Sequence, residues 1–174
     1  MVHTNKYGLI INAAVSLGIA VVSMIVGFII IRRQREARTR TPGYIFSVYW
    51  LALSLLYLFV AVRTIFGYFG FETLDKIFFY VDNVFGGLMA PSTVFLFVYL
   101  ITGGKRNIAL VSGLVIVGVW VAWNVINISA GAGHYQVTYW FTEWEPNSSL
   151  ARLIAIAGLY APAAISILGM NFSL

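Results

Sequence analysis

Five stretches of the chain are almost wholly apolar, and each is long enough to cross a lipid bilayer as a helix. A bilayer core is about 30 Å thick, so a spanning helix needs about 20 consecutive apolar residues. The five stretches are Gly8–Ile31, Tyr44–Phe66, Ile77–Thr102, Ile108–Ala130 and Leu150–Leu174. They are apolar on all sides instead of alternating, which favours helices over the strands of a membrane barrel. The sequence therefore predicts an all-α, polytopic integral membrane bundle of five transmembrane helices, forming one domain over residues 1–174.

The composition excludes several classes of protein. Only 10% of the 174 residues are charged, whereas 60% are hydrophobic. A soluble domain carries about 25% charged residues, so this chain has too few charges to cover a water-facing surface. The chain contains no cysteine, which excludes disulfides, thiolate catalysis and cysteine-ligated metals.

The positive charges gather on one predicted side of the membrane. The link after the first span and the link between the third and fourth spans carry seven of the eleven Lys and Arg residues, namely Arg32, Arg33, Arg35, Arg38, Arg40, Lys105 and Arg106. Short cytoplasmic loops are rich in Lys and Arg. We therefore expect the N-terminus outside and the C-terminus in the cytoplasm, with these residues setting the topology and contacting lipid headgroups. The net charge of +5 is then an orientation signal, and we expect no nucleic-acid partner.

Two charged residues inside predicted spans are the first candidates for a site. Arg63 lies near the outer end of the second span and Asp82 near the outer end of the third. An unpaired charge within a bilayer costs about 2.5–3.5 kcal/mol on insertion scales. Because a short link joins the two spans, we predict that Arg63 and Asp82 pair or share a polar pocket. The pair is interpreted either as a ligand, ion or proton site or as a structural ion pair.

Small and polar residues within the third and fourth spans form a second set of candidates. Small residues at helical spacing let helices approach closely, and a proline removes a backbone hydrogen bond and can kink a helix. Two interpretations stay open, a hinge beside a central cavity and ordinary close packing. The candidates are Asn83, Gly86, Pro91, Thr93, Asn124 and Asn127.

The long link between the fourth and fifth spans is dense in aromatic residues. It reads GAGHYQVTYWFTEWEPNSS, and its partial alternation is typical of a short strand or hairpin. One hypothesis is an aromatic lid over an outer pocket, and the other is a belt of aromatic residues at the membrane interface. The candidates for the lid are His134, Tyr135, Tyr139, Trp140 and Trp144.

The sequence offers no pattern that indicates catalysis. It contains no Walker loop, no dinucleotide-binding glycine run, no metalloprotease motif and no evident pairing of a nucleophile with a base. We therefore expect a non-catalytic protein with no metal and no cofactor. The last span ends at Asn171-Phe172-Ser173-Leu174 without a Lys or Arg anchor, so we also expect the native polypeptide to continue past Leu174.

The order of these features resembles a known family. The link RRQREARTRTP, the aromatic second span YIFSVYWLALSLLYLFVAVRTIF and the exit VFLFVYLITGGKR resemble the N-terminal seven-helix membrane sensor modules of prokaryotic histidine kinases. The resemblance implies an input domain with a signalling domain beyond its last helix. This sequence departs from the pattern because it shows five spans where the family has seven, and no output domain follows them.

Three functions stay open at this stage. The resemblance favours a sensor or input module in a prokaryotic plasma membrane, working by a population shift between helix packings. The lack of catalytic motifs also fits an accessory structural subunit of a larger membrane complex, with other membrane protein chains as partners besides the lipid bilayer. The third function is a small transporter or channel, although five spans without a repeat do not match the common inverted-repeat transporters. The sequence does not identify a small-molecule ligand.

Overall fold

The computed structural model describes residues 7–34, 41–146 and 148–172. Within these ranges, five helical stretches are long and apolar enough to cross a membrane, which confirms the predicted all-α class and the predicted number of such helices. The elements are α1 (Tyr7–Gln34), α2 (Thr41–Phe69), α3 (Glu72–Gly87), α4 (Met89–Ile101), α5 (Arg106–Ala130), β1 (Ala132–Val137), β2 (Thr142–Pro146), α6 (Ser149–Leu153), η1 (Ile154–Tyr160) and α7 (Ala161–Phe172).

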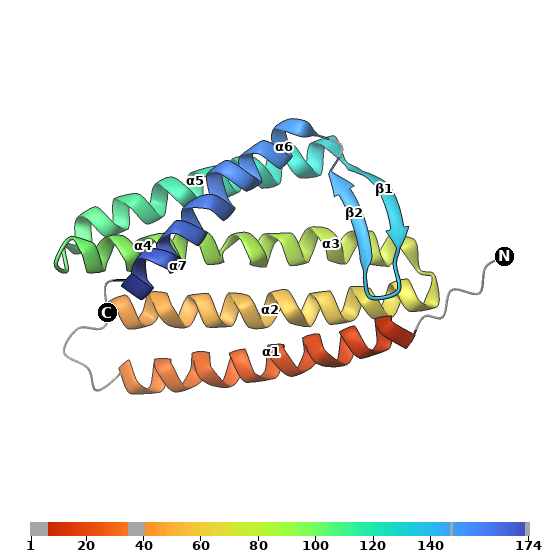
Figure 1. The fold of residues 1–174 in the computed structure, drawn as a ribbon, viewed down its shortest axis with the longest axis horizontal. Coiled ribbons are helices and arrows are strands. Elements are labelled where there is room, and N and C mark those ends of the chain that lie inside the picture. Colours follow the sequence, from red (N-terminus) through yellow and green to blue (C-terminus); the bar gives the residue numbers. More distant parts are fainter. Residues whose placement is uncertain (1–6, 35–40, 147, 173–174) are drawn as a thin grey trace.

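The helices form a bundle in which the last two stretches cross the first three at an angle. Figure 1 shows α1, α2 and the α3–α4 pair running side by side, with α5 and the α6–η1–α7 helix inclined to them. The inclined helices contact α4 much more than α3. The bundle is therefore tight at the α4 end, and the β1–β2 hairpin reaches across the opposite end from α5 toward α1 and α2 (Figure 1).

The contact between α1 and α2 is built from small residues. The buried positions of α1 recur every three or four residues, which is the spacing of one helix face. The Ser54 hydroxyl of α2 donates a hydrogen bond to the Ala20 carbonyl of α1 at 2.8 Å, so the two backbones approach closely. Besides Gly8, these buried positions are Leu9, Ala13, Ser16, Ala20, Ser23 and Gly27.

The third predicted span consists of two helices that meet at Leu88. Pro91 has no N–H to donate to the Gly87 carbonyl four residues earlier, so a regular helix cannot continue through this turn. The Leu88 N–H bonds to the Phe85 carbonyl at 3.2 Å, in the tighter pattern of a helix end. The span also begins at Glu72, earlier than the predicted Ile77, which places Asp75 inside α3.

The fifth span departs from α geometry as well. Residues Ile154–Tyr160 form a π-helix between α6 and α7. Pro162 lies two residues after its last residue, Tyr160, and cannot donate to the Gly158 carbonyl, so the widened turn ends close to the point where an α-helical bond would be missing. Such segments are rare and are often found at functional sites.

The aromatic link between α5 and α6 folds as an antiparallel hairpin. Tyr135 pairs with Trp144 and Val137 with Thr142, so these four side chains share one face of the two strands. At the turn, the Thr138 N–H donates to the Phe141 carbonyl at 2.9 Å. Thr142 and Trp144 are buried, so the shared face is turned toward the bundle.

The basic residues and the hairpin lie at opposite ends of the bundle. α1 ends and α5 begins at the end away from the hairpin, as Figure 1 shows. The link to α5 turns on Gly103 and Gly104, whose φ angles of 63° and 89° favour glycine. Arg32, Arg33, Lys105 and Arg106 are exposed there, and Arg35, Arg38 and Arg40 lie outside the described residues. We call these the basic end and the hairpin end.

Candidate functional site

Arg63 of α2 lies between two carboxylates of α3. Its Nε is 3.0 Å from Asp75 Oδ1, and its Nη1 is 3.0 Å from Asp82 Oδ2. Asp75 and Asp82 are two helical turns apart and therefore share one face of α3. The three residues are only 8%, 0% and 4% exposed, respectively. Arg63 and Asp82, which we expected to pair, are thus in direct contact, and Asp75 joins them.

The hairpin supplies the fourth member of this cluster. Arg63 Nη2 donates to the Thr142 carbonyl at 2.6 Å, and the Thr142 hydroxyl donates to Asp75 Oδ1 at 3.2 Å. Gly67 makes this docking possible, because a Cβ at Gly67 would overlap Thr142 Cγ2. The guanidinium of Arg63 also lies over the ring of Phe79, 5.1 Å from its centroid. Arg63, Asp75, Asp82 and Thr142 are called the Arg63 cluster below.

The Arg63 cluster is not electrically balanced. One guanidinium faces two carboxylates, which leaves a formal net charge of −1 in a buried position. Asp75 Oδ2 is buried and has no hydrogen-bond partner within the described part of the chain. Burial and the negative charge of Asp75 raise the pKa of the nearby Tyr135 phenol above its ordinary value, so Tyr135 faces the cluster as a neutral hydroxyl.

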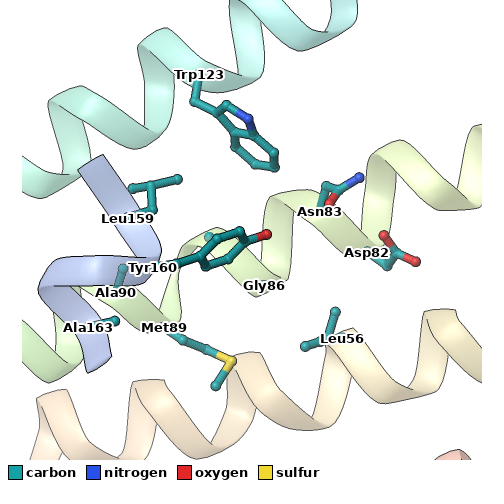
Figure 2. Close-up of a pocket in the computed structure, with 11 residues that line it drawn as sticks. Leu56, Asp82, Asn83, Gly86, Met89, Ala90, Trp123, Leu159, Tyr160 and Ala163 are labelled. Carbon is teal, nitrogen blue, oxygen red and sulfur yellow. The ribbon is translucent and has the colours of Figure 1, made fainter. Parts of the chain in front are cut away.

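A cavity of about 300 Å³ opens in the bundle beside Asp82. Figure 2 shows Asp82 and Asn83 at one end of it and the ring of Tyr160 extending across it from η1. The rest of its lining is mainly apolar, so the charged and amide side chains gather at one end of the cavity. The lining residues are Leu56, Asp82, Asn83, Gly86, Gly87, Met89, Ala90, Trp123, Leu159, Tyr160 and Ala163.

The structure separates the predicted cavity residues from one another. Asn83 and Gly86 line this cavity, whereas Pro91 lines another one, of about 200 Å³, with residues of α2 and α5. Thr93 donates to the Ala90 carbonyl at 3.0 Å, and Asn124 donates to the Trp120 carbonyl of its own helix at 2.9 Å. Asn127 is buried in α5.

The predicted lid residues also fall into two groups. The rings of Tyr135 and Trp144 lie 4.5 Å apart between centroids, on the hairpin face that meets the bundle. Tyr139 and Trp140 are exposed at the hairpin turn, and His134 is exposed on β1. The Trp140 carbonyl accepts a hydrogen bond from Asn12 Nδ2 of α1 at 2.8 Å, so the turn is held against the first helix.

Sequence reasoning missed two members of the cluster, Asp75 and Thr142. Asp75 had a usable signal, because its spacing from Asp82 of seven residues places both on one helix face. Thr142 had none, since its main-chain carbonyl makes the contact with Arg63 and any residue carries that group. No family model, no curated protein and no solved structure matches the chain. Function is therefore inferred from the geometry of this site.

Proposed function

We propose that this chain is a membrane sensor module, in which Arg63 couples the hairpin to the transmembrane helices. The observation that carries the proposal is the position of one side chain. Arg63 binds the hairpin at the Thr142 carbonyl and binds Asp82, which lines the internal cavity. A change at the hairpin or in the cavity therefore acts on the same guanidinium.

The helices around the cavity are suited to two packings. Gly86, Gly87 and Met89 lie at the junction of α3 and α4, and Leu159 and Tyr160 lie in the π-helix η1. Both segments already lack regular α-helical hydrogen bonds, so a change in helix direction there breaks fewer of them. A sensor needs such an element, whose equilibrium a signal can shift.

The charge distribution supports a direction for the signal. With the basic end in the cytoplasm, the hairpin end faces outside, in line with the positive-inside rule. The signal then arrives from outside or within the outer leaflet of a prokaryotic plasma membrane. It leaves through the links at the basic end.

The unbalanced charge favours this proposal over a structural subunit or a channel. A buried charge without a matching charge lowers stability, so helix packing alone does not call for two carboxylates around one guanidinium. A channel needs a polar path from one end to the other. The cavity instead has a polar end only at Asp82, Asn83 and Tyr160.

Distances across the basic end test the coupling. The chain has no native cysteine, so spin labels can be placed at Arg33→Cys and Leu168→Cys, both exposed positions on α1 and α7. In lipid nanodiscs, we expect Arg63→Gln to shift this distance by about 1–2 Å or more, the scale of helix shifts in switching proteins. Arg106→Gln, at an exposed site of the basic end, is the matched control. An unchanged distance in Arg63→Gln, with only the hairpin released, would rule out transmission through Arg63.

A further inference from the structure

The cavity beside Asp82 has the dimensions and the lining of a small-molecule site. Ligand pockets are mostly apolar, with a few placed polar groups, and begin at about 300 Å³. This cavity is of that size and is lined by residues of five helical elements besides α3. Trp123 and Leu159 are almost fully buried there, so both side chains pack among the neighbouring helices.

The charge at the polar end selects the chemistry of an occupant. Arg63 donates through Nε to Asp75, through Nη1 to Asp82 and through Nη2 to the Thr142 carbonyl. Its single positive charge balances only one of the two carboxylate charges. Among neighbouring groups, Tyr135 is a neutral phenol, and the Lys76 ammonium lies over the ring of Trp144 at 5.3 Å from its centroid.

A cation in the cavity would balance this charge. In the low dielectric of a membrane protein, electrostatic interactions are stronger than in water. A positive group next to Asp82 would bring the Arg63 cluster to neutrality. Trp123 and Tyr160 also line the cavity, and aromatic faces attract cations.

We propose that this cavity binds a small apolar molecule carrying one protonated amine, with the ammonium against the Asp82 carboxyl. The hydrocarbon part lies among Leu56, Met89 and Trp123, and the Tyr160 ring covers it, as their arrangement in Figure 2 allows. The biological role of this ligand, as the signal, rests on the proposed sensor function. Binding and discrimination by charge can be measured without any signalling output.

Three probes of nearly equal shape test the role of charge. The full chain in phosphatidylcholine nanodiscs is titrated at pH 7 with 2-phenylethylamine, 2-phenylethanol and phenylacetate, and binding is measured by equilibrium dialysis against empty nanodiscs. We expect saturable binding of the amine, binding of the alcohol that is about tenfold weaker or more, and no binding of the anion. The reason is that the Asp82 carboxylate attracts an ammonium group and repels a second carboxylate. Equal affinity for amine and alcohol, or no saturable binding of the amine, would overturn the proposal.

Two variants locate the bound amine. Asp82→Asn removes the proposed anchor, and we expect amine affinity to fall to that of the alcohol. Because Asp82→Asn also leaves Arg63 with one partner fewer, Ala163→Leu is the second variant. It fills the cavity from α7 and leaves the Arg63 cluster intact, and we expect it to abolish saturable binding. Ala122→Leu, at an exposed position of α5, is the control and should bind as the wild type does. Wild-type binding by Ala163→Leu would exclude this cavity.

The outcomes separate the ligand proposal from the sensor proposal. If the amine binds selectively but the distance between labels at Arg33→Cys and Leu168→Cys never changes, the site stands and the sensor function falls. If Arg63→Gln changes that distance but no amine binds, the sensor function stands and the ligand class falls.

Discussion

Arg63 and Thr142 are 79 positions apart in the chain, and Arg63 Nη2 donates to the Thr142 carbonyl at 2.6 Å. This hydrogen bond joins the second transmembrane helix to the only strands among the described residues. The same guanidinium holds two carboxylates of α3. The hairpin therefore docks on a charged group and not only on an apolar surface.

Removing the charge of Arg63 should destabilise the fold. In Arg63→Gln, Asp75 and Asp82 would stay buried without their cation, and breaking a buried ion pair typically costs 3–5 kcal/mol, so a loss of about that size is expected. The free energy of unfolding in mixed micelles measures the effect. Arg106→Gln, at an exposed position, should change it by less than about 0.5 kcal/mol. Equal values for the two variants would show that the cluster does not support the fold.

Adding a methyl group at Gly67 should displace the hairpin. A Cβ there would overlap Thr142 Cγ2, whereas a Cβ at Gly18 of α1 would meet nothing within 4 Å. We expect Gly67→Ala to raise the rate of amide hydrogen exchange over residues 134–144, because the Thr142 contacts with Arg63 and Asp75 are lost. Gly18→Ala should leave that rate unchanged. Hydrogen exchange read by mass spectrometry distinguishes them, and an unprotected hairpin in the wild type would contradict the docking.

The helical framework was predictable because lipid leaves few alternatives. Backbone groups in a bilayer must bond within their own segment, so each long apolar stretch has to be a helix. The pairing of Arg63 with Asp82 was also predictable, since an unpaired charge within a bilayer is energetically costly. The α3–α4 break lies at Leu88, although Pro91 is what interrupts the bonding, because a proline disturbs the turn before it.

The rest of the site depends on tertiary contacts that no local pattern records. Asp75 lies before the predicted start of the third span at Ile77, because hydropathy places that start at the first apolar run, whereas α3 begins with Glu72. Thr142 binds Arg63 through its main-chain carbonyl, a group that every residue carries, so the residue type does not indicate the contact. The cavity is lined by residues of α2, α3, α4, α5, η1 and α7, and the relative inclination of helices is set by packing among several of them at once.

The ionisation of Tyr135 should occur above its ordinary range. Burial and the charge of Asp75 raise its pKa above the usual value of about 10. The folded state therefore holds the phenol proton more tightly than the unfolded state does, and this contribution to stability is complete below pH 10 and is lost as the pH rises further. The tyrosinate absorbance of the wild type minus that of Tyr135→Phe isolates the group among the 10 tyrosines. A difference spectrum with a midpoint at or below pH 10 would contradict this environment.

Two adjacent glycines at the end of α3 should respond oppositely to alanine. A Cβ at Gly87 would overlap the Trp120 indole, whose Nε1 donates to the Val84 carbonyl at 3.2 Å, whereas a Cβ at Gly86 would contact only Leu56, at 3.5 Å. Overpacking costs about 1–3 kcal/mol, so we expect Gly87→Ala to lower the free energy of unfolding by that amount and to shift the tryptophan emission. Gly86→Ala should be neutral or stabilising by up to about 1 kcal/mol, because alanine is the better helix former. Since Gly86 lines the cavity, its added methyl group should also weaken binding of 2-phenylethylamine. Unfolding in mixed micelles measures both variants, and an equal loss in the two would show that α5 does not pack on Gly87 as described.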